Sequence, residues 1–121
     1  MATVARTSTY IGPNAERVVW TPLTTTNADG DPYSGNCDDV RCIQVFGTFG
    51  AGGSVQLEGS LQATPTVWHI LNDPQGNALV FTSGRIERVE ENILHLRPFI
   101  TAGDGTTSLT VIVTRALAGH R

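Results

Sequence analysis

The sequence predicts an all-β protein: a single antiparallel β-sandwich, jelly-roll-like, of about seven or eight short strands behind an extended N-terminal arm. Three observations predict this class. Short stretches of alternating or β-branched side chains recur along the chain, Gly, Pro, Asn and Asp clusters separate them, and no long helical pattern interrupts them. We therefore divide the 121 residues into an arm, residues 1–16, and a sandwich domain, residues 17–121.

The last quarter of the chain carries the strongest strand signal. Leu109, Val111 and Val113 alternate with polar or β-branched residues, which is the period of a half-buried strand. The Gly/Asp turn at Ala102–Gly105 is expected to close a hairpin between this strand and the one before it. Pro98 within that earlier strand predicts an edge or a bulge.

The upstream elements follow the same pattern. Strands are expected at residues 17–24, 40–49, 54–62, 66–71 and 78–82, and residues 85–92 fit either a short helix or a strand. Pro22, within the expected strand at residues 17–24, also predicts an edge or a bulge. Residues 25–39 read as a loop. The Thr/Ser-rich residues 1–16 fit an arm that lies on a neighbouring subunit, or a frayed terminus.

Composition favours protein contacts. Charged residues make up 16% of the chain, well below the roughly 25% usual for soluble domains. All 8 basic residues are Arg, and protein interfaces favour Arg and aromatic residues over Lys and Glu; a GC-rich coding genome would also favour Arg over Lys. We take Tyr10, Tyr33, Arg85, Arg88 and Arg97 as candidate interface residues.

Other function classes are disfavoured. A net charge of −3 argues against a nucleic-acid partner, and no apolar run approaches the roughly 20 residues of a membrane span. The first residues show no apolar stretch typical of a secretory signal. Cys42 lies in an apolar run and is expected to be a small buried residue, whereas a bond to Cys37 would close only a short loop.

No catalytic or metal-binding set is expected. The three His residues are scattered, and none has the spacing of a zinc or metalloprotease motif. Asp29, Asp31, Asp38 and Asp39 flank one loop, but the terminal Glu of a calcium-binding loop is missing, so turn-forming Asp is favoured. We therefore expect no cofactor and no enzymatic activity.

The aromatic residues leave one alternative open. Trp20, Tyr33 and Trp68 could stack on sugar rings, as in glycan-binding modules built on sandwiches. Both Trp residues lie within strand runs, which favours core packing, whereas Tyr33 lies in the long loop and is expected to be exposed.

Several segments of the chain resemble small virion proteins of tailed bacteriophages. The resemblance covers roughly Gln56 to Arg115 and is carried by five segments: Val55–Ser60 (VQLEGS), Asp73–Ala78 (DPQGNA), Val89–Glu91 (VEE), Leu96–Pro98 (LRP) and Gly103–Thr107 (GDGTT).

The resemblance implies a β-sandwich of the type that decorates or cements a capsid. On that basis we expect no cofactor, a location on the virion capsid surface after synthesis in the host cytoplasm, and the major capsid protein as partner. Self-association as a trimer or dimer about a local symmetry axis is also expected. A tail, neck or head–tail adaptor component is the alternative within the same particle.

Overall fold

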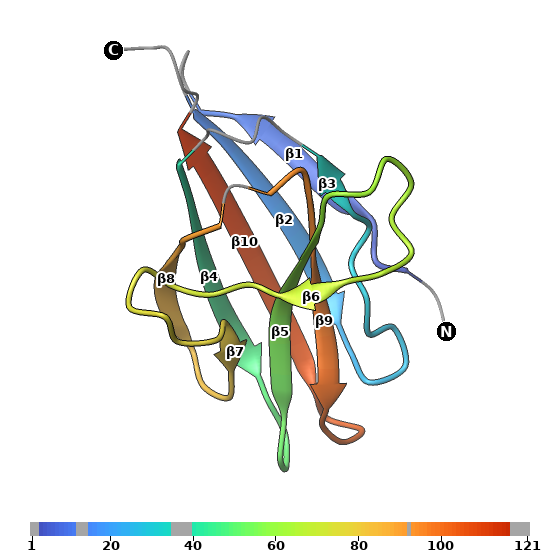
Figure 1. Ribbon diagram of the computed structural model, residues 1–121. Helices are drawn as coiled ribbons and strands as arrows, with labels where there is room; N and C mark the ends of the chain where they lie inside the picture. Colours follow the sequence, from blue (N-terminus) through green and yellow to red (C-terminus); the bar gives the residue numbers. More distant parts are fainter. Residues whose placement is uncertain (1–2, 12–14, 35–39, 92, 117–121) are drawn as a thin grey trace.

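The computed structural model describes residues 3–11, 15–34, 40–91 and 93–116. These residues form an all-β sandwich of two antiparallel sheets, as the sequence predicts (Figure 1). Ten strands are present: β1 (Arg6–Tyr10), β2 (Ala15–Leu23), β3 (Tyr33–Ser34), β4 (Val40–Thr48), β5 (Ser54–Ser60), β6 (His69–Ile70), β7 (Val80–Phe81), β8 (Arg85–Val89), β9 (His95–Ala102) and β10 (Ser108–Ala116).

The strand order is that of a jelly roll. One sheet runs β1-β2-β10-β4-β8, and the other runs β3-β9-β5-β6, with β7 also paired to β5. β2 therefore pairs with β10, β3 with β9, β4 with β8, and β5 with β6 and β7. This nested pairing of early with late strands is the double Greek key of jelly-roll domains.

The alternating apolar side chains of the strands form the core, as the sequence predicts. Leu109, Val111 and Val113 are buried between the sheets, facing Val55 and Leu57 of the opposite layer in one apolar cluster. Burying such aliphatic side chains is the main force that holds the two layers together. Trp20 lies in the same core, fully buried, and its indole Nε1 donates to the carbonyl of Asp31 at 2.9 Å.

The expected terminal hairpin is wrong. The turn at residues 102–105 does not pair β9 with β10; it carries the chain from one sheet to the other. Both strands present their apolar side chains to the shared interior, so Ile100 and Leu109 belong to one core cluster but come from opposite sheets. A Gly-rich turn allows either arrangement, and the pairing of β10 with β2 and β4 decides between them.

Pro22 occupies a position of the predicted kind, but the edge or bulge predicted at Pro98 is wrong: β9 lies between β3 and β5, and its register with β5 shifts only between Ser54 and Val55. The β2–β10 register shifts beside Pro22, which confirms a bulge there. Pro98 pairs with Leu57 of β5, while its carbonyl accepts from the Gly30 N–H at 2.9 Å on the other side. The N–H that Pro98 lacks would point to that same side, away from the β5 ladder.

Strand assignments at the two ends of the chain differ from expectation. Residues 85–89 form strand β8, so the strand interpretation of that segment holds and the helical one does not. Arg6–Tyr10, expected within an arm, forms the exposed edge strand β1 against β2 of its own chain, and β2 begins at Ala15. An arm over a neighbouring subunit stays a prediction. Cys37 and the Asp38–Asp39 pair lie outside the described residues.

Candidate functional site

The five predicted interface residues do not form one surface. Tyr10 lies on edge strand β1 and is exposed. Arg85 and Arg88 lie on β8, the opposite edge of the same sheet, and Arg97 lies on β9 in the other sheet. Tyr33, on β3, is only 5% exposed, so its predicted exposure is wrong.

Tyr33 is buried because its hydroxyl has a buried acceptor. It donates to Glu16 Oε1 at 2.5 Å, and the Arg115 Nε donates to the same oxygen at 2.8 Å. The guanidinium of Arg115 also lies 5.7 Å from the centre of the Tyr33 ring. Burial, followed by the bond to Glu16, holds the pKa of the Tyr33 hydroxyl well above its ordinary value. This cluster closes one end of the sandwich.

Arg97 is the centre of a second polar cluster, on the outer side of the sheet that contains β3, β9, β5, β6 and β7. Its guanidinium lies 3.1 Å from Glu58 Oε1 and 3.5 Å from Asp29 Oδ2. It also lies 4.4 Å from the ring centre of Trp68 and 5.5 Å from that of Phe99. Arg97 is therefore engaged within its own chain, and the two carboxylates are neutralised by it instead of facing a ligand.

The sheet of β1, β2, β10, β4 and β8 has an outer face of unusual composition. We define this outer face by the side chains that alternate with the buried rows of its strands: Thr7, Thr9, Ala15, Arg17, Val19, Thr21, Val40, Cys42, Gln44, Phe46, Thr48, Ile86, Arg88, Ser108, Thr110, Ile112, Thr114 and Ala116.

The outer face is apolar and Thr-rich, and its charge is one-sided. Phe46 and Ile86 are 44% and 64% exposed on it. Its charged members are Arg17 and Arg88, and none of these described positions is Asp or Glu, although the chain has 11 acidic residues. A surface that combines aliphatic side chains, hydroxyls and Arg without carboxylates has the composition of a protein contact.

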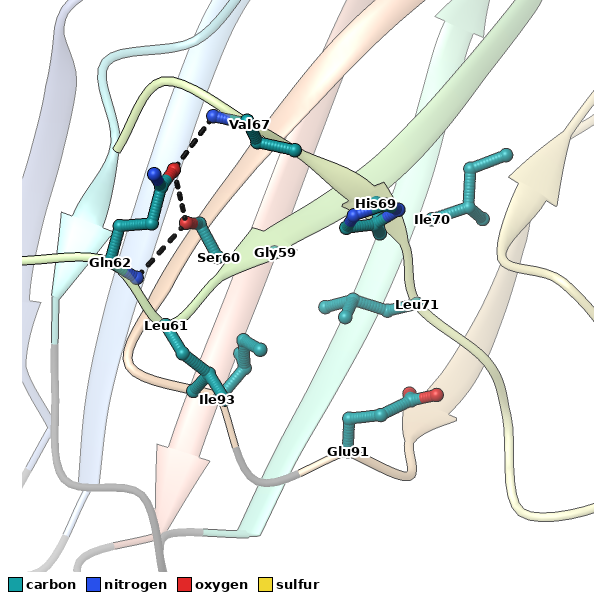
Figure 2. A pocket seen from close by; sticks show the side chains of 10 residues that line it. All are labelled: Gly59, Ser60, Leu61, Gln62, Val67, His69, Ile70, Leu71, Glu91 and Ile93. Carbon is teal, nitrogen blue, oxygen red and sulfur yellow. Dashed lines mark hydrogen bonds between the residues drawn. The ribbon is translucent and has the colours of Figure 1, made fainter. Parts of the chain in front are cut away.

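A hollow lies beside the end of β5, on the other side of the sandwich (Figure 2). We call it the β5 hollow; its volume is about 660 Å³. Its lining consists of Gly59, Ser60, Leu61, Gln62, Val67, His69, Ile70, Leu71, Glu91 and Ile93. Leu71 and Ile93 are buried at its floor, whereas Leu61, Val67 and Ile70 are exposed around it.

Hydrogen bonds hold the wall of the β5 hollow in place. Gln62 Oε1 accepts from the backbone N–H of Val67 at 2.7 Å, and the Gln62 N–H donates to Ser60 Oγ at 3.2 Å (Figure 2). At the opposite side, the Glu91 carboxylate accepts from the N–H and the Nδ2 of Asn72, both at 2.7 Å.

The sequence alone does not predict the β5 hollow, because three separate segments form it. The strands expected at residues 54–62 and 66–71 include Leu61 and Ile70, yet these two side chains are 68% and 40% exposed. An apolar residue directly after a strand and before a Thr/Pro-rich loop is the only local signal that the sequence offers.

The described residues contain no group of three or more His, Cys, Asp or Glu side chains that could hold a metal ion. Asp29 and Asp31, which were weighed as calcium ligands, accept from Thr3 and pair with Arg6, respectively. Cys42 has a free thiol and is partly exposed, not buried as expected. Within the described ranges no helix has the length and apolar character needed to cross a membrane.

Comparisons with known proteins give one structural likeness. No protein-family model and no curated protein matches the sequence. A solved structure described as the crystal structure of FeII HppE superposes with a TM-score of 0.45 and 18% sequence identity. The superposition covers 91% of this chain and 48% of that one, so this chain spans about half of its length.

Proposed function

We propose that this protein is a structural component of a tailed-bacteriophage virion that decorates and cements the capsid. In this role it binds the lattice of the major capsid protein and has no catalytic task. The observation that carries the proposal is the outer face of the β1-β2-β10-β4-β8 sheet, which is partly to fully exposed, rich in Thr and aliphatic side chains, and free of carboxylates at its described positions.

The chemistry of the outer face suits a repeating protein surface. Apolar side chains such as Phe46 and Ile86 lose water on contact, which supplies most of the binding free energy. Arg17 and Arg88 add bidentate donors for carboxylates or backbone carbonyls of the partner. The partner surface is therefore expected to be apolar with acidic or neutral polar groups. Tyr10 is opposite Glu16 in the β1–β2 pairing, so its side chain lies on the other side of the sheet and takes no part in this contact.

Co-sedimentation with purified capsids of the phage whose genome encodes this chain tests the proposal. The natural protein is expected to saturate capsids at a fixed ratio of hundreds of copies per particle. Binding of the double variant Phe46→Asp/Ile86→Asp should fall at least tenfold, because two carboxylates replace apolar contacts. Thr101→Asp on the opposite sheet is the matched control and should bind as the natural protein does.

Two results would reject the cement role. A natural protein that leaves capsids bare would exclude decoration, and saturation at a dozen copies or fewer would assign the chain to the tail, neck or head–tail adaptor. Light scattering of the free protein is an independent test of the expected trimer or dimer.

The glycan-binding alternative loses two of its three aromatic residues. Trp20 and Tyr33 are buried, and one face of Trp68 lies against Arg97. We therefore do not propose it as the primary function.

A further inference from the structure

The β5 hollow lies apart from the outer face and has no part in the proposed capsid contact. Three of the eight exposed large hydrophobic side chains among the described residues gather at this hollow: Leu61, Val67 and Ile70. The other five lie on strands of the β1-β2-β10-β4-β8 sheet or directly after β1. The apolar surface of the molecule is thus concentrated in two places that are on different sheets.

The β5 hollow has the size and lining of a binding site. Its volume of about 660 Å³ lies within the roughly 300–1,000 Å³ typical of ligand pockets, and its floor of Leu71 and Ile93 is apolar. The floor is also closely packed: a Cβ on Gly59 would come within 2.6 Å of Ile93 Cγ1. The floor of the hollow is therefore fixed by close packing within the chain.

One fixed negative charge makes the β5 hollow favour cationic over anionic ligands. Glu91 is the only carboxylate among its lining residues, and no Arg or Lys lines it. Both oxygens of Glu91 accept hydrogen bonds from Asn72, which hold the negative charge at one place without neutralising it. A cationic group beside an apolar one would complement this lining, whereas an anionic group would be repelled.

The wall facing Glu91 is fixed before any partner arrives. Gln62 bridges the end of β5 to the returning loop through the N–H groups of Thr66 and Val67, at 2.8 and 2.7 Å. Because these bonds exist in the free chain, little conformational entropy would be lost on binding.

We propose that the β5 hollow is a docking site for an extended peptide segment of a partner protein. The segment places an aliphatic side chain between Val67, Ile70 and the floor, and a basic side chain beside Glu91. An apolar recess supplies affinity for the aliphatic side chain, and a complementary charge beside it supplies specificity. This proposal does not depend on the virion role, because it uses different residues.

Titration of the full chain, followed by the backbone amide NMR signals, tests the docking site. The probes are three capped dipeptides: acetyl-Leu-Lys-amide, acetyl-Leu-Glu-amide and acetyl-Gly-Lys-amide. Leu-Lys should shift signals of residues 59–71 and 91–93 and bind about threefold tighter than Leu-Glu, as a surface ion pair allows. Gly-Lys should bind at least tenfold more weakly than Leu-Lys, because it lacks the aliphatic anchor.

Variants separate the two parts of the site. Ile70→Asp should weaken Leu-Lys binding at least tenfold, and Glu91→Gln should abolish the preference for Leu-Lys over Leu-Glu. Ile11→Asp is the matched control, because Ile11 is 47% exposed against 40% for Ile70 but lies directly after β1, and peptide binding by this variant should be unchanged.

Three outcomes would overturn the proposal. The first is the absence of localised shifts with Leu-Lys, and the second is equal affinity for all three probes. The third is a dimer in light scattering that Ile70→Asp dissociates, because a second copy of the chain would then occupy the hollow in place of a partner peptide.

Discussion

Gly59 offers the sharpest test of how β5 packs. A methyl group at this position would lie 2.6 Å from Ile93 Cγ1 and 2.8 Å from Leu71 Cδ2. Carbon atoms prefer a separation of about 3.5–4.0 Å, so each contact is short by roughly 1 Å. Overpacking of this kind costs about 1–3 kcal/mol, which we expect for Gly59→Ala.

A double-mutant cycle isolates the clash. Ile93→Ala alone removes buried carbons and is expected to cost about 2–4 kcal/mol, but it also makes room for the new methyl group. The double variant should therefore be about 1–2 kcal/mol more stable than the sum of the single changes predicts.

Urea unfolding followed by circular dichroism measures each free energy of unfolding. Gly105→Ala is the matched control: a Cβ there would meet no atom within 4 Å, so stability should stay within about 0.5 kcal/mol of the natural protein. Two results would exclude the clash at Gly59. One is a free energy of unfolding for Gly59→Ala equal to that of Gly105→Ala, and the other is additivity of the Gly59 and Ile93 changes within about 0.3 kcal/mol.

Three further predictions follow from other polar and aromatic groups. The Asp104 pKa is lowered to about 2, chiefly by the Thr106 hydroxyl, so its contribution to stability is present above pH 3.8 and lost as the pH falls towards 2. In Asp104→Asn the melting temperature should depend less on pH across that interval. A pH dependence equal to that of the natural protein would contradict this. Tyr33→Phe should cost about 1–2 kcal/mol in urea unfolding through the lost bond to Glu16. Because burial raises the Tyr33 pKa, the natural protein should lose more stability than this variant as pH rises above 10, and parallel losses would exclude the effect. Iodide should quench only the part of the tryptophan fluorescence that Trp68→Phe removes, because Trp68 is partly exposed and the other Trp is fully buried; quenching that survives the substitution would argue against this burial.

The sandwich could be predicted because its evidence is local. The alternation of Leu109, Val111 and Val113 reports directly which side chains face the interior, and the structure confirms it. Pro22 marks a bulge for an equally local reason, the missing N–H. What alternation does not report is which strand lies beside which, and this is why the expected β9–β10 hairpin was wrong.

The errors at single residues have the same origin. Tyr33 lies in a segment with the composition of a loop, and its burial depends on Glu16 and Arg115, which are distant in sequence. The β5 hollow likewise needs Gly59, Ile70 and Ile93 from three segments that only the fold brings together. Long-range polar partners and concave surfaces depend on topology, whereas one sequence shows only neighbours along the chain.

The central place of β10 constrains how the chain folds. β10 is the last described strand, yet it lies between β2 and β4 and pairs with both along nearly their whole length. During synthesis those two strands must wait for the C-terminal segment, with their hydrogen-bonding edges unpaired. Such non-local pairing slows folding and exposes the unfinished chain to aggregation. We expect the sandwich to form only after the C-terminal strand leaves the ribosome, so deletion of residues 108–116 should yield an insoluble product and not a smaller sandwich.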